Sequence, residues 1–354
     1  MKNMYGLDFP SLSHRFIYSY AIPKLNFTDP NCGVDEQSQQ QFKAFLRGML
    51  EVLYSDPTII DMPFFEDTYS WKEDSKIFNP KKLKIENKFW RFVDFLIKLG
   101  ETSELDEGAL IIGKKAVRIK PRLEQLDAVG FEVEDVGENY RITNSDFPQM
   151  FAAFKYQASR KFKSPQHARR SFVLGIMDER TFTAKECYGE FLPDTGFAEK
   201  VEEYCRQNGF VCIGDEWLEC RIQWEKEFQK KKRILFMVFS EPWKQYQVKY
   251  TVRVSDFGAV FAEFAGMSDG LKQMILDEAY PCGGCKYCVQ TDKTGKKPIA
   301  VSKVSHNGVN KAICSYYPLY EMHELSTDRA EYLIELMTIA DKVLGEKYGY
   351  KKST

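Results

Sequence analysis

The sequence predicts an α+β protein, with a mainly helical N-terminal half and a C-terminal half built on an antiparallel sheet with flanking helices. Apolar residues recur at intervals of three and four over residues 42–53 and 89–96, which is the spacing of one helix face. Three runs of strand character, separated by polar turns, occupy residues 218–254. Hydrophobic residues make up 44% and charged residues 29% of the chain, which excludes a disordered protein.

The N-terminal half begins with two predicted core helices. The first, at residues 42–53, stops before Asp56 and Pro57, because proline cannot continue a helix. The second, at residues 89–96, is predicted to end at Gly100, where glycine can adopt a left-handed cap. A third helix at residues 122–130 and a hairpin around Gly137 follow, so this half is mainly helical.

The helix and hairpin carry a resemblance to a known family. Leu123 and Leu126 lie three apart before Gly130, and the two strands of the hairpin end at Thr143. This resembles the closing part of a winged-helix domain, within a segment of about residues 85–145, and the resemblance implies contact with DNA. The candidate nucleic-acid-binding residues are Lys115, Arg118, Lys120 and Arg122.

Two features oppose a DNA contact at this helix. Pro121 is best tolerated in the first turn, which moves the cations into the preceding loop. Acidic residues at 124, 127, 132, 134, 135 and 138 would repel a phosphate backbone. The alternative is a solvated helix and hairpin used only for packing.

The chain length of 354 residues predicts two domains, at residues 1–160 and 171–354. Residues 160–170 are rich in cations and contain no acid. We interpret this stretch as a polar linker between the domains, although its cations could also contact phosphates.

In the C-terminal half, the strand-like runs at residues 218–228, 234–239 and 246–254 predict a three-stranded meander. The middle run is apolar throughout, as expected for a central strand covered on both faces. Helices are predicted near residues 197–208, 257–276 and 330–344, and a hairpin at residues 299–314.

Four cysteines have the spacing of a metal site. They are Cys282, Cys285, Cys288 and Cys314. A gap of two residues lets neighbouring thiolates converge on one ion, and the second strand of the hairpin would return Cys314 to the other three. Four thiolates form the closed tetrahedral shell of a structural zinc, whereas a catalytic zinc keeps one position open for water. Zinc is therefore the predicted cofactor.

Other chemistries fit the same cysteines. An iron–sulfur cluster also accepts four thiolates, a redox dithiol needs only Cys282 and Cys285, and His306 could replace one cysteine in a mixed site. Six lysines and one acid, Asp292, lie between Cys282 and Cys314. These lysines could offset the negative charge of the thiolates or face a nucleic acid.

The whole-chain features bound the function. The net charge of −1 by itself points to no partner, so any affinity for nucleic acid or a membrane would have to come from a local patch. The longest apolar runs have the length of a strand and are too short to span a bilayer. We expect a cytoplasmic location, because no secretion signal opens the sequence and the clustered cysteines suit a reducing compartment.

No motif of catalysis is recognisable, since His14, His167, His306 and His323 are isolated in the sequence. We expect a zinc-containing binding or regulatory protein, with DNA or a small-molecule ligand as partner, whose plan resembles that of ligand-responsive regulators. The alternatives are an enzyme of unknown reaction with a structural zinc, and an iron–sulfur protein.

Overall fold

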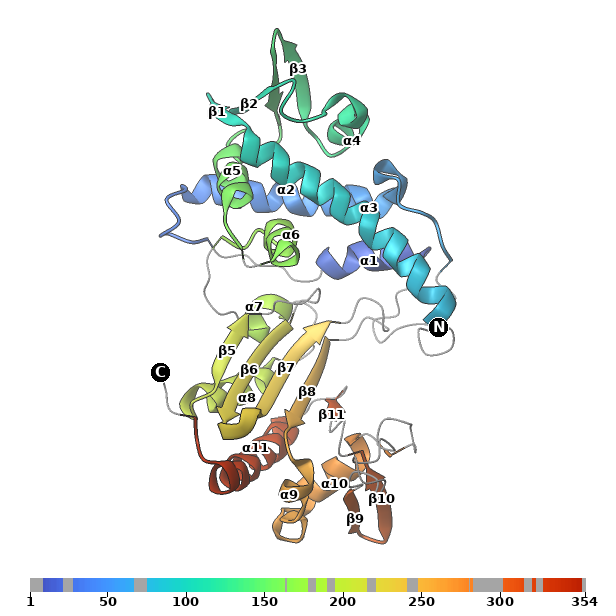
Figure 1. Cartoon of the computed structure of the whole chain (residues 1–354), viewed down its shortest axis with the longest axis vertical. Coiled ribbons are helices and arrows are strands. Elements are labelled where there is room, and N and C mark those ends of the chain that lie inside the picture. The colour runs from blue at the N-terminus through green and yellow to red at the C-terminus, as the bar shows by residue number, and fades with distance from the viewer. Residues whose placement is uncertain are drawn as a thin grey trace.

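A computed structural model describes most of the chain. The described residues are 9–21, 28–66, 75–162, 164–177, 183–189, 195–214, 221–240, 248–279, 281–282, 302–314, 320–322 and 327–351. Within them the chain forms eleven α-helices and three antiparallel sheets (Figure 1). The predicted α+β class is therefore confirmed.

The helices of the N-terminal half pack around one buried cluster. They are α1 (Leu12–Ala21), α2 (Glu36–Ser55), the 3-10 turn η1 (Pro57–Ile60), α3 (Ser75–Thr102), α5 (Phe151–Ser159) and α6 (Pro165–Val173). At the start of α2 the Asp35 carboxylate accepts a hydrogen bond of 2.8 Å from the backbone N–H of Ser38, and the helix ends before Pro57 as predicted. The predicted apolar stripe of α2 is buried.

Gly100 does not end its helix, so the predicted cap is wrong. Helix α3 continues to Thr102, and Gly100 lies where α5 crosses it. A Cβ atom at Gly100 would come within 2.7 Å of the Ala158 Cβ and 2.8 Å of the Phe154 ring. The missing side chain therefore permits the close approach of two helices.

A small sheet follows α3. Its strands are β1 (Glu104–Asp106), β2 (Ala109–Gly113), β3 (Glu132–Val136) and β4 (Asn139–Thr143), in the order β1-β2-β4-β3, and η2 (Lys120–Arg122) and α4 (Leu123–Ala128) precede β3. The predicted hairpin is confirmed, with Gly137 at φ +74 in its turn. The helix before it, α4, is only six residues long, and the described residues do not establish a winged-helix domain.

The basic stretch at residues 160–170 is not a free linker. Residues 165–170 belong to α6, which packs on α3 and α5. The Arg169 guanidinium donates two hydrogen bonds of 2.6 Å to the Asp94 carboxylate on α3, and Arg160 donates one of 2.6 Å to the carbonyl of Ile176. These contacts attach the stretch to the N-terminal helices.

The C-terminal half is built on a five-stranded sheet. Its strands are β5 (Val211–Gly214), β6 (Arg221–Phe228), β7 (Lys232–Ser240), β8 (Val248–Val254) and β11 (Tyr320–Met322), in the order β11-β8-β7-β6-β5. The predicted meander is confirmed, with Trp224, Phe236 and Val252 in register across its three strands. Residues 234–238 are all buried, so β7 is covered on both faces as its apolar run predicted.

Helices and a second hairpin complete this half. They are α7 (Ala184–Tyr188), α8 (Gly196–Gln207), α9 (Phe257–Phe261), the 3-10 turn η4 (Phe264–Gly266), α10 (Asp269–Glu278), α11 (Thr327–Tyr348), and the strands β9 (Ser302–His306) and β10 (Val309–Ile313). Helix α11 packs on α8 and on the sheet, while β9 lies against α9 and α10 (Figure 1). The predicted hairpin and terminal helix are confirmed in their described parts.

The buried apolar side chains form two clusters. One extends along the chain from Leu12 to Met177, and the other from Leu174 to Leu344. The side chains of α6 belong to the first cluster, and the division into two domains stays a prediction. None of the described helices combines the length and apolar character needed to span a bilayer.

Candidate functional site

Cys282 and Cys314, two of the four predicted metal ligands, lie on adjacent backbone segments. Pro281 pairs with Ile313 in an antiparallel bridge, and the backbone N–H of Cys282 donates a hydrogen bond of 2.8 Å to the carbonyl of Ala312. Cys282 is therefore opposite Ala312 and diagonal to Cys314. A diagonal position across an antiparallel pair corresponds to roughly 7–8 Å between the two backbones, so the first and last cysteines of the motif lie near each other along the two segments.

This arrangement, which we name the cysteine corner, consists of residues 281–282 and 312–314. The Cys314 side chain is buried and that of Cys282 is half-buried. Nearby, the Lys311 ammonium donates a hydrogen bond of 2.6 Å to the carbonyl of Leu276 in the last turn of α10. Partial burial lowers the pKa of this lysine. The corner is therefore attached to α10 as well as to the hairpin.

The remaining two predicted ligands, Cys285 and Cys288, lie outside the described residues. His306, the alternative ligand, pairs with Val309 at the turn of the hairpin, whereas Cys282 joins the opposite end near Ile313. Four residues of strand separate the two ends, which is about 13 Å. Within the described part of the chain, no three His, Cys, Asp or Glu side chains converge as a metal site.

Three cysteines outside this motif, Cys187, Cys205 and Cys212, pack in the C-terminal apolar cluster. Cys187 and Cys205 are buried, Cys32 and Cys212 are half-buried, and Cys220 lies outside the described residues. Burial raises the pKa of the Cys212 thiol to about 12. Burial also raises the pKa of the Cys205 thiol, so both Cys205 and Cys212 are weak nucleophiles at neutral pH, since the thiolate is the reactive form.

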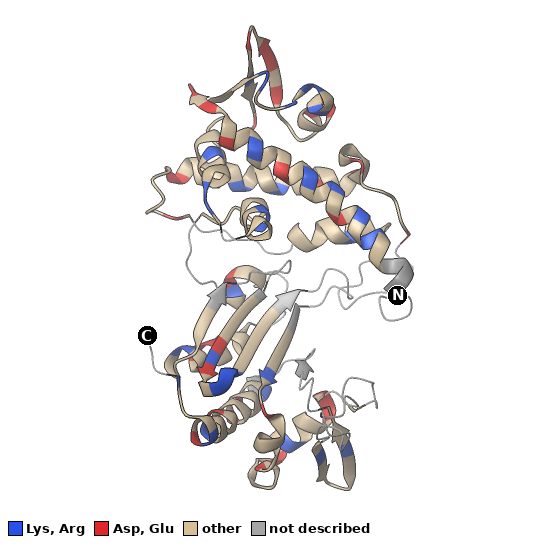
Figure 2. Cartoon of the chain, viewed as in Figure 1, with Lys and Arg blue, Asp and Glu red and all other residues tan. Residues whose placement is uncertain are grey.

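The four candidate nucleic-acid-binding residues have two different environments. Lys115 and Arg118 are exposed on the segment between β2 and η2, and Lys120 is exposed at the first position of η2. The Arg122 guanidinium instead lies 4.9 Å from the centre of the Phe95 ring and donates a hydrogen bond of 2.7 Å to Gln125. Figure 2 shows this basic segment beside the acidic strand β3. Three cations therefore face solvent, while Arg122 packs on α3.

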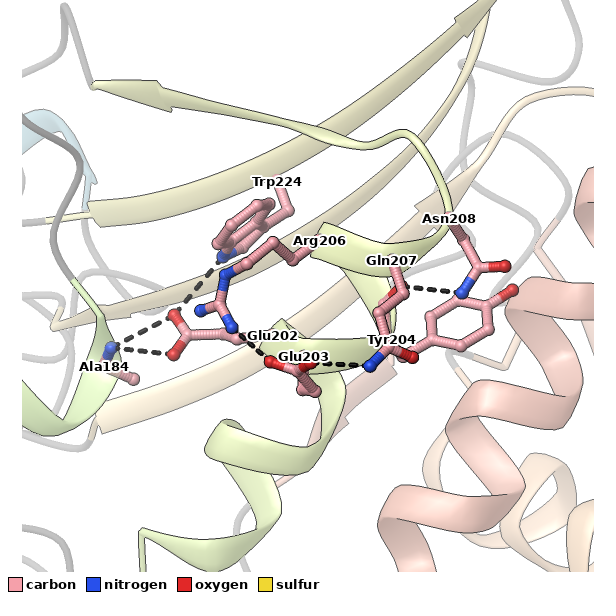
Figure 3. A network of polar contacts seen from close by, with 8 residues as sticks. All are labelled: Ala184, Glu202, Glu203, Tyr204, Arg206, Gln207, Asn208 and Trp224. Carbon is pink, nitrogen blue, oxygen red and sulfur yellow. Dashed lines mark hydrogen bonds and ion pairs between the residues drawn. The ribbon is translucent and has the colours of Figure 1, made fainter.

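A buried carboxylate, Glu202, was missed in the sequence. It lies on α8 with 1% of its surface exposed, and its two oxygens accept the backbone N–H of Ala184 at 3.1 and 3.2 Å (Figure 3). The indole N–H of Trp224 on β6 donates to the same carboxylate at 3.3 Å. Glu202 thus connects α7, α8 and the sheet.

The protonation of Glu202 is unusual for a glutamate. Burial raises its pKa from 4.5 to about 7, although the Trp224 and Ala184 hydrogen bonds and the nearby Arg206 act in the opposite direction. One signal could have revealed it, because Glu202 is four residues after Ala198 and three before Cys205 on the apolar face of α8. An acid on such a face needs partners from other elements. The arrangement can hold a proton, but the carboxylate is too enclosed for direct contact with a substrate.

The chain matches no protein-family model, and neither a curated protein nor a solved structure has significant similarity to it. The function is therefore inferred from the residues and their geometry.

Proposed function

We propose that the C-terminal half is a zinc-stabilised binding module, in which Cys282, Cys285, Cys288 and Cys314 hold one structural Zn²⁺. The chain as a whole is then a cytoplasmic binding or regulatory protein without catalysis. The hydrogen bond between the backbones of Cys282 and Ala312 supports this proposal most strongly, because it holds the first cysteine of the motif opposite a residue two positions before the fourth.

The chemistry of the corner favours a cation. Cys314 is 6% exposed, so a thiolate there requires a positive partner, and thiolates bind zinc at about 2.3 Å. The ladder pairs the first cysteine of the motif with the strand that precedes the fourth. Only the segment carrying Cys285 and Cys288 has to fold over the ion. The β-bridge already brings the two ends of this segment of 32 positions together, so most of the entropic cost of closing it does not fall on metal binding.

A structural zinc would fix the relative positions of the β9–β10 hairpin, the end of α10 and the cysteine segment. Its closed ligand shell leaves no site for water, so it supplies folding energy and not catalysis. The result would be a rigid surface beside α10, which suits binding of a partner.

Elemental analysis of the purified chain tests the metal. We expect one equivalent of zinc, lost in Cys282→Ser and in Cys314→Ser. The matched control is Cys32→Ser, since Cys32 is half-buried in the N-terminal half, where its sulfur accepts a hydrogen bond of 3.2 Å from Gln39. This variant should retain the zinc.

Three results would reject the zinc assignment. Iron together with the brown colour of a cluster would identify an iron–sulfur protein. A metal-free chain in which Cys282 and Cys285 cycle between thiol and disulfide would identify a redox dithiol. Retention of zinc in both Cys282→Ser and Cys314→Ser would place the metal elsewhere.

DNA binding is a second candidate, supported by the exposure of Lys115, Arg118 and Lys120 on one segment. Neutralising all three with glutamine should weaken duplex binding and reduce the slope of log affinity against log salt by about 3, because each phosphate contact adds roughly 0.9. Lys185→Gln on α7, an exposed lysine of the other half, is the single-charge control. An unchanged slope in the triple variant would reject this candidate.

A further inference from the structure

The turn between β6 and β7 places two lysines in a backbone conformation that disfavours them. The loop consists of Gln229, Lys230 and Lys231, and the last two have φ of 55° and 56°. Residues with a Cβ adopt this left-handed region reluctantly, and tight hairpin turns prefer asparagine and glycine there. The strain indicates that the lysine side chains serve something other than the stability of the turn.

These lysines line a groove at the end of the sheet. Its volume is about 540 Å³, within the range of small-molecule sites. Four cations and one acid line it, namely Lys230, Lys231, Arg233, Lys351 and Glu227. The cations come from the turn, from β7 and from the C-terminal segment. Charges far apart in the sequence therefore converge on one space.

The C-terminal segment is held against the turn by main-chain contacts. The backbone N–H of Gln229 donates a hydrogen bond of 3.0 Å to the carbonyl of Gly349, and Phe228 pairs with Tyr350 in an antiparallel bridge. The rings of Phe228 and Tyr350 also lie 5.6 Å apart. Gly349 has φ +77 and reverses the chain after α11, which brings Lys351 to the groove. Main-chain contacts therefore fix the backbone that carries the groove.

The positive charge of the groove is only partly offset. Lys351 pairs with Glu227, and the Arg233 guanidinium lies 3.6 Å from the buried Glu225 carboxylate. The Lys230 ammonium lies 5.8 Å from the centre of the Tyr348 ring, an attraction that leaves its charge unchanged. Counting both glutamates, the four cations leave a surplus of two. A site with this surplus favours an anion with several oxygens.

We propose that this groove binds a small phosphate-bearing ligand, with Lys230 and Lys231 as its principal contacts. The phosphate oxygens would accept hydrogen bonds from the lysines of the turn, and Arg233 and Lys351 add positive charge to the lining of the groove. The strained turn then persists because a relaxed asparagine–glycine turn would remove both cations. This site is separate from the cysteine corner and does not rest on the zinc proposal.

Calorimetric titration of the full chain with inorganic pyrophosphate at low salt tests the proposal. We expect the wild type to bind, and Lys230→Gln with Lys231→Gln to weaken binding at least tenfold with little change in melting temperature, since the strained turn remains. Lys230→Asn with Lys231→Gly should weaken binding equally but raise the melting temperature, because those residues suit the left-handed turn.

The control removes the same charge elsewhere. Lys185 and Lys200 lie on α7 and α8 and pair with Glu199 and Glu331, and Lys185→Gln with Lys200→Gln should bind pyrophosphate as the wild type does. Equal loss in this control would show attraction to net charge and overturn the proposal. Absence of wild-type binding, or tighter binding of a single-stranded oligonucleotide than of pyrophosphate, would also overturn it. The zinc content is expected to stay constant in all these variants.

Discussion

Substitution of Glu202 by glutamine should change how the stability of the protein depends on pH. In the folded state the pKa of Glu202 is about 7, while in an unfolded chain it returns to the ordinary value of 4.5. The folded protein therefore binds this proton more tightly than the unfolded chain. The resulting stabilisation is fully present below pH 4.5 and is lost as the pH rises through 7.

The size of the effect follows from these two values. A difference of one in pKa corresponds to about 1.4 kcal/mol, so the rise from 4.5 to about 7 corresponds to about 3 kcal/mol. The side chain is 1% exposed, which leaves little solvent screening of this contribution. Other charged groups adjust it, since Arg206 on α8 lowers the pKa and Glu186 on α7 raises it.

Urea unfolding at several pH values between 4 and 8 measures the effect. Between these limits the wild type should lose about 3 kcal/mol more unfolding free energy than Glu202→Gln, whose amide oxygen still accepts from Ala184 and Trp224 but cannot ionise. The control is Glu203→Gln, because Glu203 is exposed on the same helix and accepts a hydrogen bond of 2.6 Å from Gln207. Parallel profiles for the wild type and Glu202→Gln would refute the reasoning.

Three further substitutions test the packing of the N-terminal half. Gly100→Ala should lower the unfolding free energy by about 1–3 kcal/mol, because its Cβ would overlap Ala158. Gly48→Ala should instead raise the unfolding free energy by about 0.5–1 kcal/mol, because Gly48 is also inside a helix but no atom lies within 4 Å of the added Cβ. A shift of the two melting temperatures in the same direction would contradict this argument. Arg169→Ala should lower the free energy by about 1 kcal/mol at low salt and by less at high salt, since its partner Asp94 is partly exposed; a salt-independent loss would assign the effect to packing.

Local patterns in the sequence were sufficient for most elements. Helical spacing at residues 42–53, strand alternation at residues 246–254 and the apolar run at residues 234–239 each report which faces a segment buries. That information is present in neighbouring residues, so these elements were correctly predicted. The spacing of the cysteines, on which the zinc proposal rests, is likewise a local property of the sequence.

The errors occurred where a distant partner decides the conformation. Glycine at position 100 is typical of a helix end, but α3 continues past it. The glycine is there because a side chain would fill the space that α5 occupies. Residues 165–170 have the composition of a linker, yet Arg169 contacts Asp94, 75 positions earlier. Local composition contains no record of such partners.

The sequence alone determined the α+β class, the order of the main elements and the kinds of side chain available for binding. The tertiary structure decided which segments and side chains meet: the Cys282 backbone beside Ala312, Glu202 between α7 and Trp224, and Lys351 beside the strained turn at Lys230. The physical reason is that periodicity is set by residues within a few turns or strand positions. Which side chains come together is set by packing between elements that are far apart in the sequence.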